Sequence, residues 1–152
     1  MVTSIVRDVR EPASTARATI TTIPWPASLL AGRFHALLAL SDERLVEALT
    51  RHIQAEHELS DSARHEAVLA RLQAWLELDA EDRLVLARAW ERALDGFPAE
   101  YRARCREAER AVLMNGLTFG DFRALARALP WLRRRDYLDA FADEPAPAEA
   151  AV

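Results

Sequence analysis

The sequence is poor in the features from which disulfides and membrane spans are built. Its 152 residues include one cysteine, so no intrachain disulfide can form and a reducing compartment is the simplest expectation. No apolar run approaches the roughly 20 residues of a membrane-spanning helix. The N-terminus also lacks the continuous apolar core of a signal peptide. We therefore expect a soluble, cytoplasmic protein with no membrane partner.

Familiar catalytic motifs are missing as well. The chain has no glycine-rich phosphate loop, Gly-x-Ser-x-Gly elbow, Cys-x-x-Cys pair or dinucleotide-binding fingerprint. Lysine is absent, because all twenty basic residues are arginine. We attribute this preference to codon bias in a GC-rich genome rather than to a site. These absences favour a non-catalytic protein of bacterial type that uses no cofactor.

What is present is the composition of a helical domain. Hydrophobic residues make up 51% and charged residues 29% of the chain, and this length suits one domain. The net charge of −4 is unevenly distributed: residues 1–40 carry +2, residues 41–100 carry −7, residues 101–141 carry +4 and the tail carries −3. An acidic middle is thus followed by a basic stretch.

The clearest helix signal lies between residues 79 and 97. Asp79 stands at the N-cap position, where its carboxylate can accept a hydrogen bond from a free backbone N–H. Leu86, Trp90, Ala93 and Phe97 then recur at steps of three and four residues, a spacing typical of one buried helix face. We expect Leu86 and Trp90 to be buried.

Similar signals for the start of a helix recur along the chain. Ser41 precedes a second apolar-periodic stretch, and Thr118 precedes another, with Asp121 completing a capping-box pattern. The three starts are separated by 38 and 39 residues. This spacing suggests tandem helical hairpins, although capped helices of ordinary length can also produce it by chance. In either case we expect neighbouring helices to pack antiparallel.

The predicted fold is therefore all-α, with six or seven helices in residues 27–141 that form a compact bundle or a short array of antiparallel helical hairpins. Residues 1–26 are rich in Thr, Val and Ile, which favours an extended or β-hairpin N-terminal arm. We expect Pro130 to close the sixth helix and to open a candidate seventh. We expect residues 142–152 to form a disordered tail.

A histidine-rich segment offers one candidate metal site. His52 and Glu56 are four residues apart and share a helix face. A turn near residues 58–61 would bring His65 and Glu66 opposite them, and these groups could ligate a transition metal. The spacing matches no established metal motif, so a charged surface beside a turn is the alternative.

The arginine-rich helices of residues 98–135 offer a DNA-binding alternative. Their arrangement resembles a helix-turn-helix in outline only, with Arg123, Arg127 and Arg134 as the candidate contacts. Acidic residues are interleaved with the arginines, and the whole chain is acidic. Phosphate binding requires a net positive face, so nucleic acid is not the favoured partner.

Four tryptophans separate into two pairs. Trp75 and Trp90 lie on expected inner faces, whereas Trp25 and Trp131 lie at element boundaries beside prolines. An aromatic residue at a boundary can anchor a partner or cover one end of the core.

We therefore favour a protein–protein interaction, adaptor or regulatory protein that binds another protein or a second copy of itself. Its candidate contacts are Trp25, Trp131, Arg133, Arg134 and Arg135. Cys105 lies on an expected inner face and is interpreted as a structural thiol.

Overall fold

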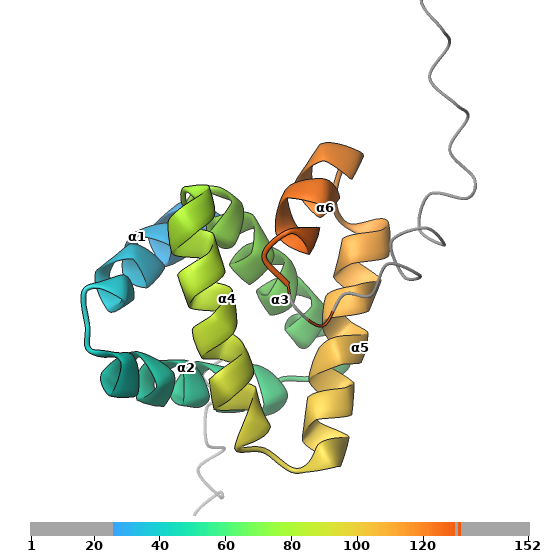
Figure 1. Ribbon diagram of the computed structural model, residues 1–152. Helices are drawn as coiled ribbons and strands as arrows, with labels where there is room; N and C mark the ends of the chain where they lie inside the picture. Colours follow the sequence, from blue (N-terminus) through green and yellow to red (C-terminus); the bar gives the residue numbers. More distant parts are fainter. Residues whose placement is uncertain (1–25, 130, 132–152) are drawn as a thin grey trace, which may run out of the picture.

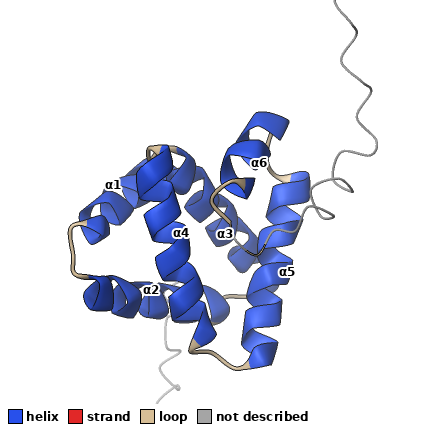
Figure 2. Cartoon of the chain, viewed as in Figure 1, coloured by secondary structure: helices blue, strands red, loops and turns tan. Residues whose placement is uncertain are grey.

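The computed structural model describes residues 26–129 and 131, and all the secondary structure in these ranges is helical (Figures 1 and 2). The predicted all-α fold is confirmed for this part of the chain. No helix within it is both long and apolar enough to cross a membrane. The helices are α1 (Ala27–Leu38), α2 (Asp42–His57), α3 (Asp61–Leu76), α4 (Ala80–Asp95), α5 (Ala99–Asn115) and α6 (Phe119–Ala126).

The predicted helix starts are confirmed, and their caps differ in detail. Asp79 Oδ1 accepts a hydrogen bond from the Asp82 N–H at 2.8 Å, and Thr118 Oγ1 accepts one from the Asp121 N–H at 3.3 Å. Ser41 has the extended backbone of an N-cap, but its side chain makes no capping hydrogen bond. The start of α2 therefore depends on its backbone and first-turn acids more than on the serine hydroxyl.

The helix starts are regularly spaced, and the repeating unit is a single helix with its turn rather than a helical hairpin. Helices α2, α3, α4 and α5 begin at residues 42, 61, 80 and 99, so each start lies 19 residues after the previous one. Each of the three connections between them has three residues. The 38-residue spacing seen in the sequence is therefore two helices with their turns.

Two of these turns are held by an arginine in the same way. The guanidinium groups of Arg64 and Arg83 each donate to three main-chain carbonyl oxygens, which lie eight, seven and five residues earlier, at 2.7 to 3.2 Å. These bonds satisfy carbonyl groups that a helix C-terminus leaves unpaired. Arg102 lies 19 residues after Arg83 but forms no such side-chain bonds within the described ranges.

Helices that are two apart in sequence are the main packing partners. The most extensive contacts join α1 to α3, α2 to α4 and α3 to α5, while sequence neighbours contact each other less. Figure 1 shows consecutive helices meeting at a shared turn, with α3 lying among the others. The helices are packed compactly, as the bundle alternative predicted, but the expectation that sequence neighbours are the main packing pairs does not match these contacts. Apolar periodicity identified the buried faces but not the helix that covers each of them.

The core is centred on aromatic residues from α1, α3 and α4. The Trp75 and Trp90 rings meet edge to face with centroids 5.6 Å apart, and Phe34 packs against Trp75 at 6.2 Å. All three residues are fully buried, as is Leu86. The predicted burial of Leu86, Trp75 and Trp90 is confirmed.

Three predicted features lie outside the described residues. They are the N-terminal arm up to residue 25, the seventh helix beyond Pro130, and the tail of residues 142–152. They stay predictions.

Candidate functional site

A surface groove runs between α1 and α2. It has a volume of about 670 Å³, and its apolar lining residues are Leu37, Leu40 and Ala48. Three arginines and one glutamate line it, and two of these arginines, Arg44 and Arg51, come from residues 41–100, which carry a net charge of −7. We call this surface the α1–α2 groove, and its residues are Arg33, Leu37, Leu40, Arg44, Glu47, Ala48 and Arg51.

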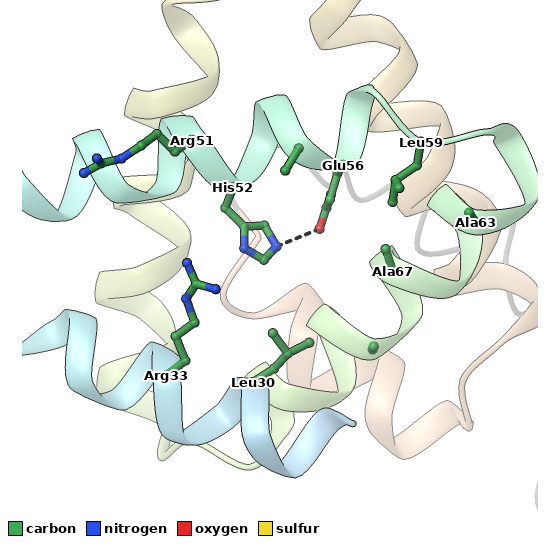
Figure 3. A pocket seen from close by; sticks show the side chains of 10 residues that line it. Leu30, Arg33, Arg51, His52, Glu56, Leu59, Ala63 and Ala67 are labelled. Carbon is green, nitrogen blue, oxygen red and sulfur yellow. Dashed lines mark hydrogen bonds and ion pairs between the residues drawn. The ribbon is translucent and has the colours of Figure 1, made fainter. Parts of the chain in front are cut away.

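A second hollow, with a volume of about 190 Å³, adjoins the groove and shares Arg33 and Arg51 with it. Its walls come from α1, α2, the α2–α3 turn and α3 (Figure 3). Four alanines leave the space open because their side chains are short. We call it the alanine cavity, and it is lined by Leu30, Arg33, Arg51, His52, Ala55, Glu56, Leu59, Ala63, Ala67 and Ala70.

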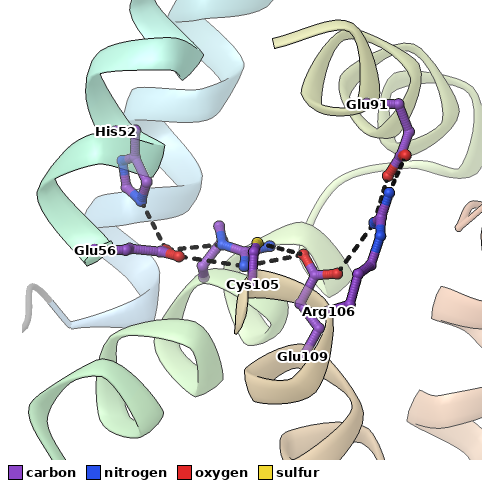
Figure 4. Close-up of polar contacts among 7 residues, drawn as sticks. His52, Glu56, Glu91, Cys105, Arg106 and Glu109 are labelled. Carbon is purple, nitrogen blue, oxygen red and sulfur yellow. Dashed lines mark hydrogen bonds and ion pairs between the residues drawn. The ribbon is translucent and has the colours of Figure 1, made fainter. Parts of the chain in front are cut away.

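A buried polar network begins at His52 and Glu56 (Figure 4), which are two of the side chains that line the alanine cavity. His52 Nε2 lies 3.1 Å from Glu56 Oε1. Arg71 of α3 donates from Nε to Glu56 Oε1 at 2.8 Å, and its Nη2 lies 3.1 Å from Glu109 Oε1 of α5. Arg71 and Glu109 are fully buried. A single guanidinium thus bridges carboxylates from two helices that flank α3.

The buried polar network continues to α4. Arg106 donates from Nη1 to Glu109 Oε2 at 3.4 Å and also forms a two-pronged ion pair with Glu91. The network therefore links α2, α3, α5 and α4 through alternating charges. Such a network is unfavourable if one member is removed, because a buried charge without a partner is costly.

The Arg71 guanidinium also packs on the aromatic core. Its central carbon lies 3.9 Å from the centroid of the Trp90 ring and 5.2 Å from that of Trp75. Arg71 Nη1 has no hydrogen-bond partner within the described ranges. The ring faces attract the cation and partly replace the missing hydrogen bond.

Burial and ion pairing have opposite effects on the pKa values of the two carboxylates that contact Arg71. Burial opposes ionisation of Glu56, but the Arg71 guanidinium and the His52 hydrogen bond outweigh it and lower the pKa of Glu56 to about 2. Burial raises the pKa of Glu109, although Arg71 and Arg106 oppose that effect. Glu56 is therefore a paired anion at neutral pH.

The candidate metal ligands are only partly brought together. His52 and Glu56 meet as their spacing predicted, but Glu56 is bound to Arg71. His65 is exposed and lines a different hollow beside Arg104. The described ranges contain no group of three or more His, Cys, Asp or Glu side chains placed to hold a metal ion.

Two of the three candidate nucleic-acid contacts lie within the described residues. Arg123 of α6 and Arg127 just after it are exposed, and Arg134 lies outside the described residues. Arg106, which belongs to the same basic stretch, is bound to Glu91 and Glu109. Its charge is thereby balanced within the protein.

The candidate partner anchors are mostly beyond the described ranges, which exclude Trp25 and the run Arg133, Arg134 and Arg135. Trp131 is half-buried and packs against the core. The guanidinium carbons of Arg106 and Arg110 lie 5.0 and 5.9 Å from its ring centroid. This packing favours a role in covering the core.

Cys105 shows the properties of a structural thiol. It is partly buried, and its Sγ lies 4.0 Å from Glu109 Oε1. Burial and the Glu109 carboxylate raise the pKa of the Cys105 thiol to about 12. The thiolate, which is the reactive form, is therefore scarce at neutral pH.

Neither the arginines of the groove nor Arg71, the centre of the buried network, was predicted as a site residue from the sequence. Arg44 and Arg51 are seven residues apart, so they share one face of α2, a signal that was available. Arg71 lies three residues after Val68 and four before Trp75. It therefore occupies a position on the apolar face of α3, which marks it as a buried charge.

Comparisons with known proteins identify no relative. No protein-family model matches the chain, and searches of curated proteins and of solved structures also found no match.

Proposed function

We propose that this protein is a non-catalytic interaction protein, an adaptor or regulator, that binds an acidic amphipathic helix of another protein in the α1–α2 groove. The observation that carries the proposal is the combination of apolar lining residues with three arginines and a single glutamate in one groove. An amphipathic helix lays its apolar face into such a groove and places charged residues along the edges.

The charges of the groove support an acidic partner. Arg33, Arg44 and Arg51 are all exposed, and Glu47 is the single carboxylate of the lining. Glu47 lies 3.4 Å from Arg51, but an ion pair between two exposed side chains contributes at most about 1 kcal/mol. A partner carboxylate can therefore replace Glu47 at little cost.

The apolar residues support a partner that offers leucine-like side chains. Leu40 is 39% exposed and Leu29, on the neighbouring surface of α1, is 58% exposed. Covering such side chains is favourable by about 25 cal/mol per Å² of apolar surface. Charge complementarity then contributes specificity and association rate more than affinity.

Fluorescence anisotropy with a synthetic peptide tests this proposal. The labelled peptide has about four helical turns, with leucine at every third or fourth position and glutamate on both flanks. We expect saturable binding that weakens as salt is added. The variant Arg44→Glu should weaken binding by about tenfold or more.

The matched control is Arg88→Glu, which makes the same charge change at an exposed position on α4 outside the groove. It should leave the affinity unchanged within about twofold. A peptide with the same leucines but lysine in place of glutamate should bind weakly. Equal binding of the two peptides, or equal effects of the two variants, would contradict the proposal.

A further inference from the structure

The alanine cavity has the construction of a small-molecule site. α1, α2, the α2–α3 turn and α3 all contribute to its walls, and the wall residues Leu30, Leu59, Ala63 and Ala67 are apolar. Its volume of about 190 Å³ is comparable with the roughly 150 Å³ of an engineered apolar cavity that takes up benzene. An occupant of this cavity is therefore about the size of one aromatic ring or a short alkyl chain.

The polar side chains of the cavity divide into an inner pair and two arginines. His52 and Glu56 are hydrogen-bonded to each other, and Glu56 is also paired with Arg71 behind it. The Glu56 charge is thus already balanced and does not require a cation in the cavity. Arg33 extends from α1 toward His52, and Arg51 extends along α2 (Figure 3).

This arrangement favours an anion with a small apolar body. Arg33 and Arg51 also line the α1–α2 groove, so they stand where the cavity adjoins the surface. A guanidinium binds a carboxylate with two parallel hydrogen bonds, while the alanine and leucine walls can bury a ring or a short chain. The pairing of Arg51 with Glu47 is solvent-exposed and is easily exchanged.

We propose that the alanine cavity binds a small organic carboxylate, with its apolar body against the α3 alanines and its carboxylate at Arg33 and Arg51. The inference goes beyond the protein-binding role and does not depend on it. The peptide titration and the ligand titration are separate measurements, so either proposal can fail while the other stands.

Isothermal titration calorimetry with benzoate and hexanoate tests the proposal, and benzamide serves as the neutral counterpart of benzoate. We expect at least one of the two carboxylates to bind with one-site stoichiometry and a Kd of about 1 mM or below. Benzamide should bind at least about tenfold more weakly, because it lacks the charge that the arginines recognise.

Three variants locate the site. Ala67→Leu fills the cavity and should abolish carboxylate binding, whereas Ala103→Leu, at an exposed position on α5, should leave it unchanged. Arg33→Gln should weaken binding by about tenfold while leaving the apolar walls of the cavity unchanged. Far-UV circular dichroism confirms that each variant is folded, and Arg33→Gln still provides a test if Ala67→Leu is not.

Several results would overturn the proposal. The absence of binding by both carboxylates at about 10 mM, well above the expected Kd, would remove the site. Equal binding of benzamide and benzoate would remove the role of the arginines. Binding that survives Ala67→Leu in a folded variant, or that Arg33→Gln leaves unchanged, would place the ligand elsewhere.

Discussion

Replacing Arg71 with methionine should destabilise the protein more than any change of an exposed arginine. Arg71 is fully buried, bridges Glu56 and Glu109, and lies on the Trp90 ring. Methionine has a similar length but no charge, so the variant leaves two buried carboxylates without their shared cation. Removing one partner of a buried ion pair costs about 3–5 kcal/mol.

Urea unfolding followed by circular dichroism at neutral pH measures this loss. A loss of this size is a large fraction of the 5–15 kcal/mol that stabilises a typical domain. Each kcal/mol also corresponds to roughly 4–8 °C in Tm for a domain of about 100 residues. If Arg71→Met does not fold, Arg71→Lys keeps the charge but loses the two parallel hydrogen bonds that Arg71 Nε and Nη2 donate to the Glu56 carboxylate, and should give a smaller, measurable loss.

A matched control and a compensating variant make the result decisive. Arg88→Met, at an exposed position of α4, should change stability by no more than about 0.5 kcal/mol. Replacing Glu56 and Glu109 with leucine together with Arg71→Met removes all three charges, and should recover much of the loss. A loss below about 1 kcal/mol in a folded Arg71→Met variant, with no gain from the triple replacement, would refute this reasoning.

Three further predictions follow from the same structure. The pKa of Glu56 is lowered to about 2 from 4.5, so its pairing stabilises the fold above pH 4.5 and that contribution is lost as the pH falls toward 2. In urea titrations, the stability difference between the protein and Glu56→Gln should therefore shrink over this pH range. A constant difference would contradict the prediction. The Gly116→Ala variant should be less stable than the Gly96→Ala variant by about 1 kcal/mol. A Cβ at residue 116 would lie 3.0 Å from the Val112 carbonyl oxygen, whereas a Cβ at residue 96 would lie 3.4 Å from its nearest atom. Thermal unfolding of the two variants measures the difference. Cys105, whose thiol pKa is raised to about 12, should react with a disulfide reagent at pH 8 far more slowly in the native protein than in urea, and equal rates would show that it is not shielded.

The sequence was sufficient to predict the helices and most of the buried positions. Asp79 and Thr118 mark helix starts because their side chains accept hydrogen bonds from backbone groups three residues later, and this chemistry is local. Leu86 and Trp90 are buried because apolar side chains repeat on one helix face. Features that depend on a few adjacent residues could therefore be predicted.

The packing of the helices could not be predicted in the same way. Apolar faces on α1 and α2 indicate that both must be covered, but many partners satisfy that requirement equally well. The extensive contacts of α1 with α3 and of α2 with α4 also depend on turns that Arg64 and Arg83 hold from the following helix. A side chain reaching back eight residues leaves no periodic signal.

The candidate site was missed for a related reason. Arg33 and Arg51 belong to different helices and become neighbours only when α1 and α2 enclose the groove. The C-terminal arginines were predicted as contacts because they are consecutive or closely spaced in the sequence. Among the described residues of that stretch, Arg106 is bound to Glu91 and Glu109, so density of charge was a poor guide to its availability.

The claim that the α1–α2 groove is the binding surface is tested most directly by amide chemical-shift mapping with the acidic amphipathic peptide. We expect the peptide to shift resonances of α1 and α2 around Leu37, Arg44 and Ala48, and to leave those of α6 around Arg123 unchanged. Shifts confined to α5 and α6, or no shifts at saturating peptide, would contradict the claim.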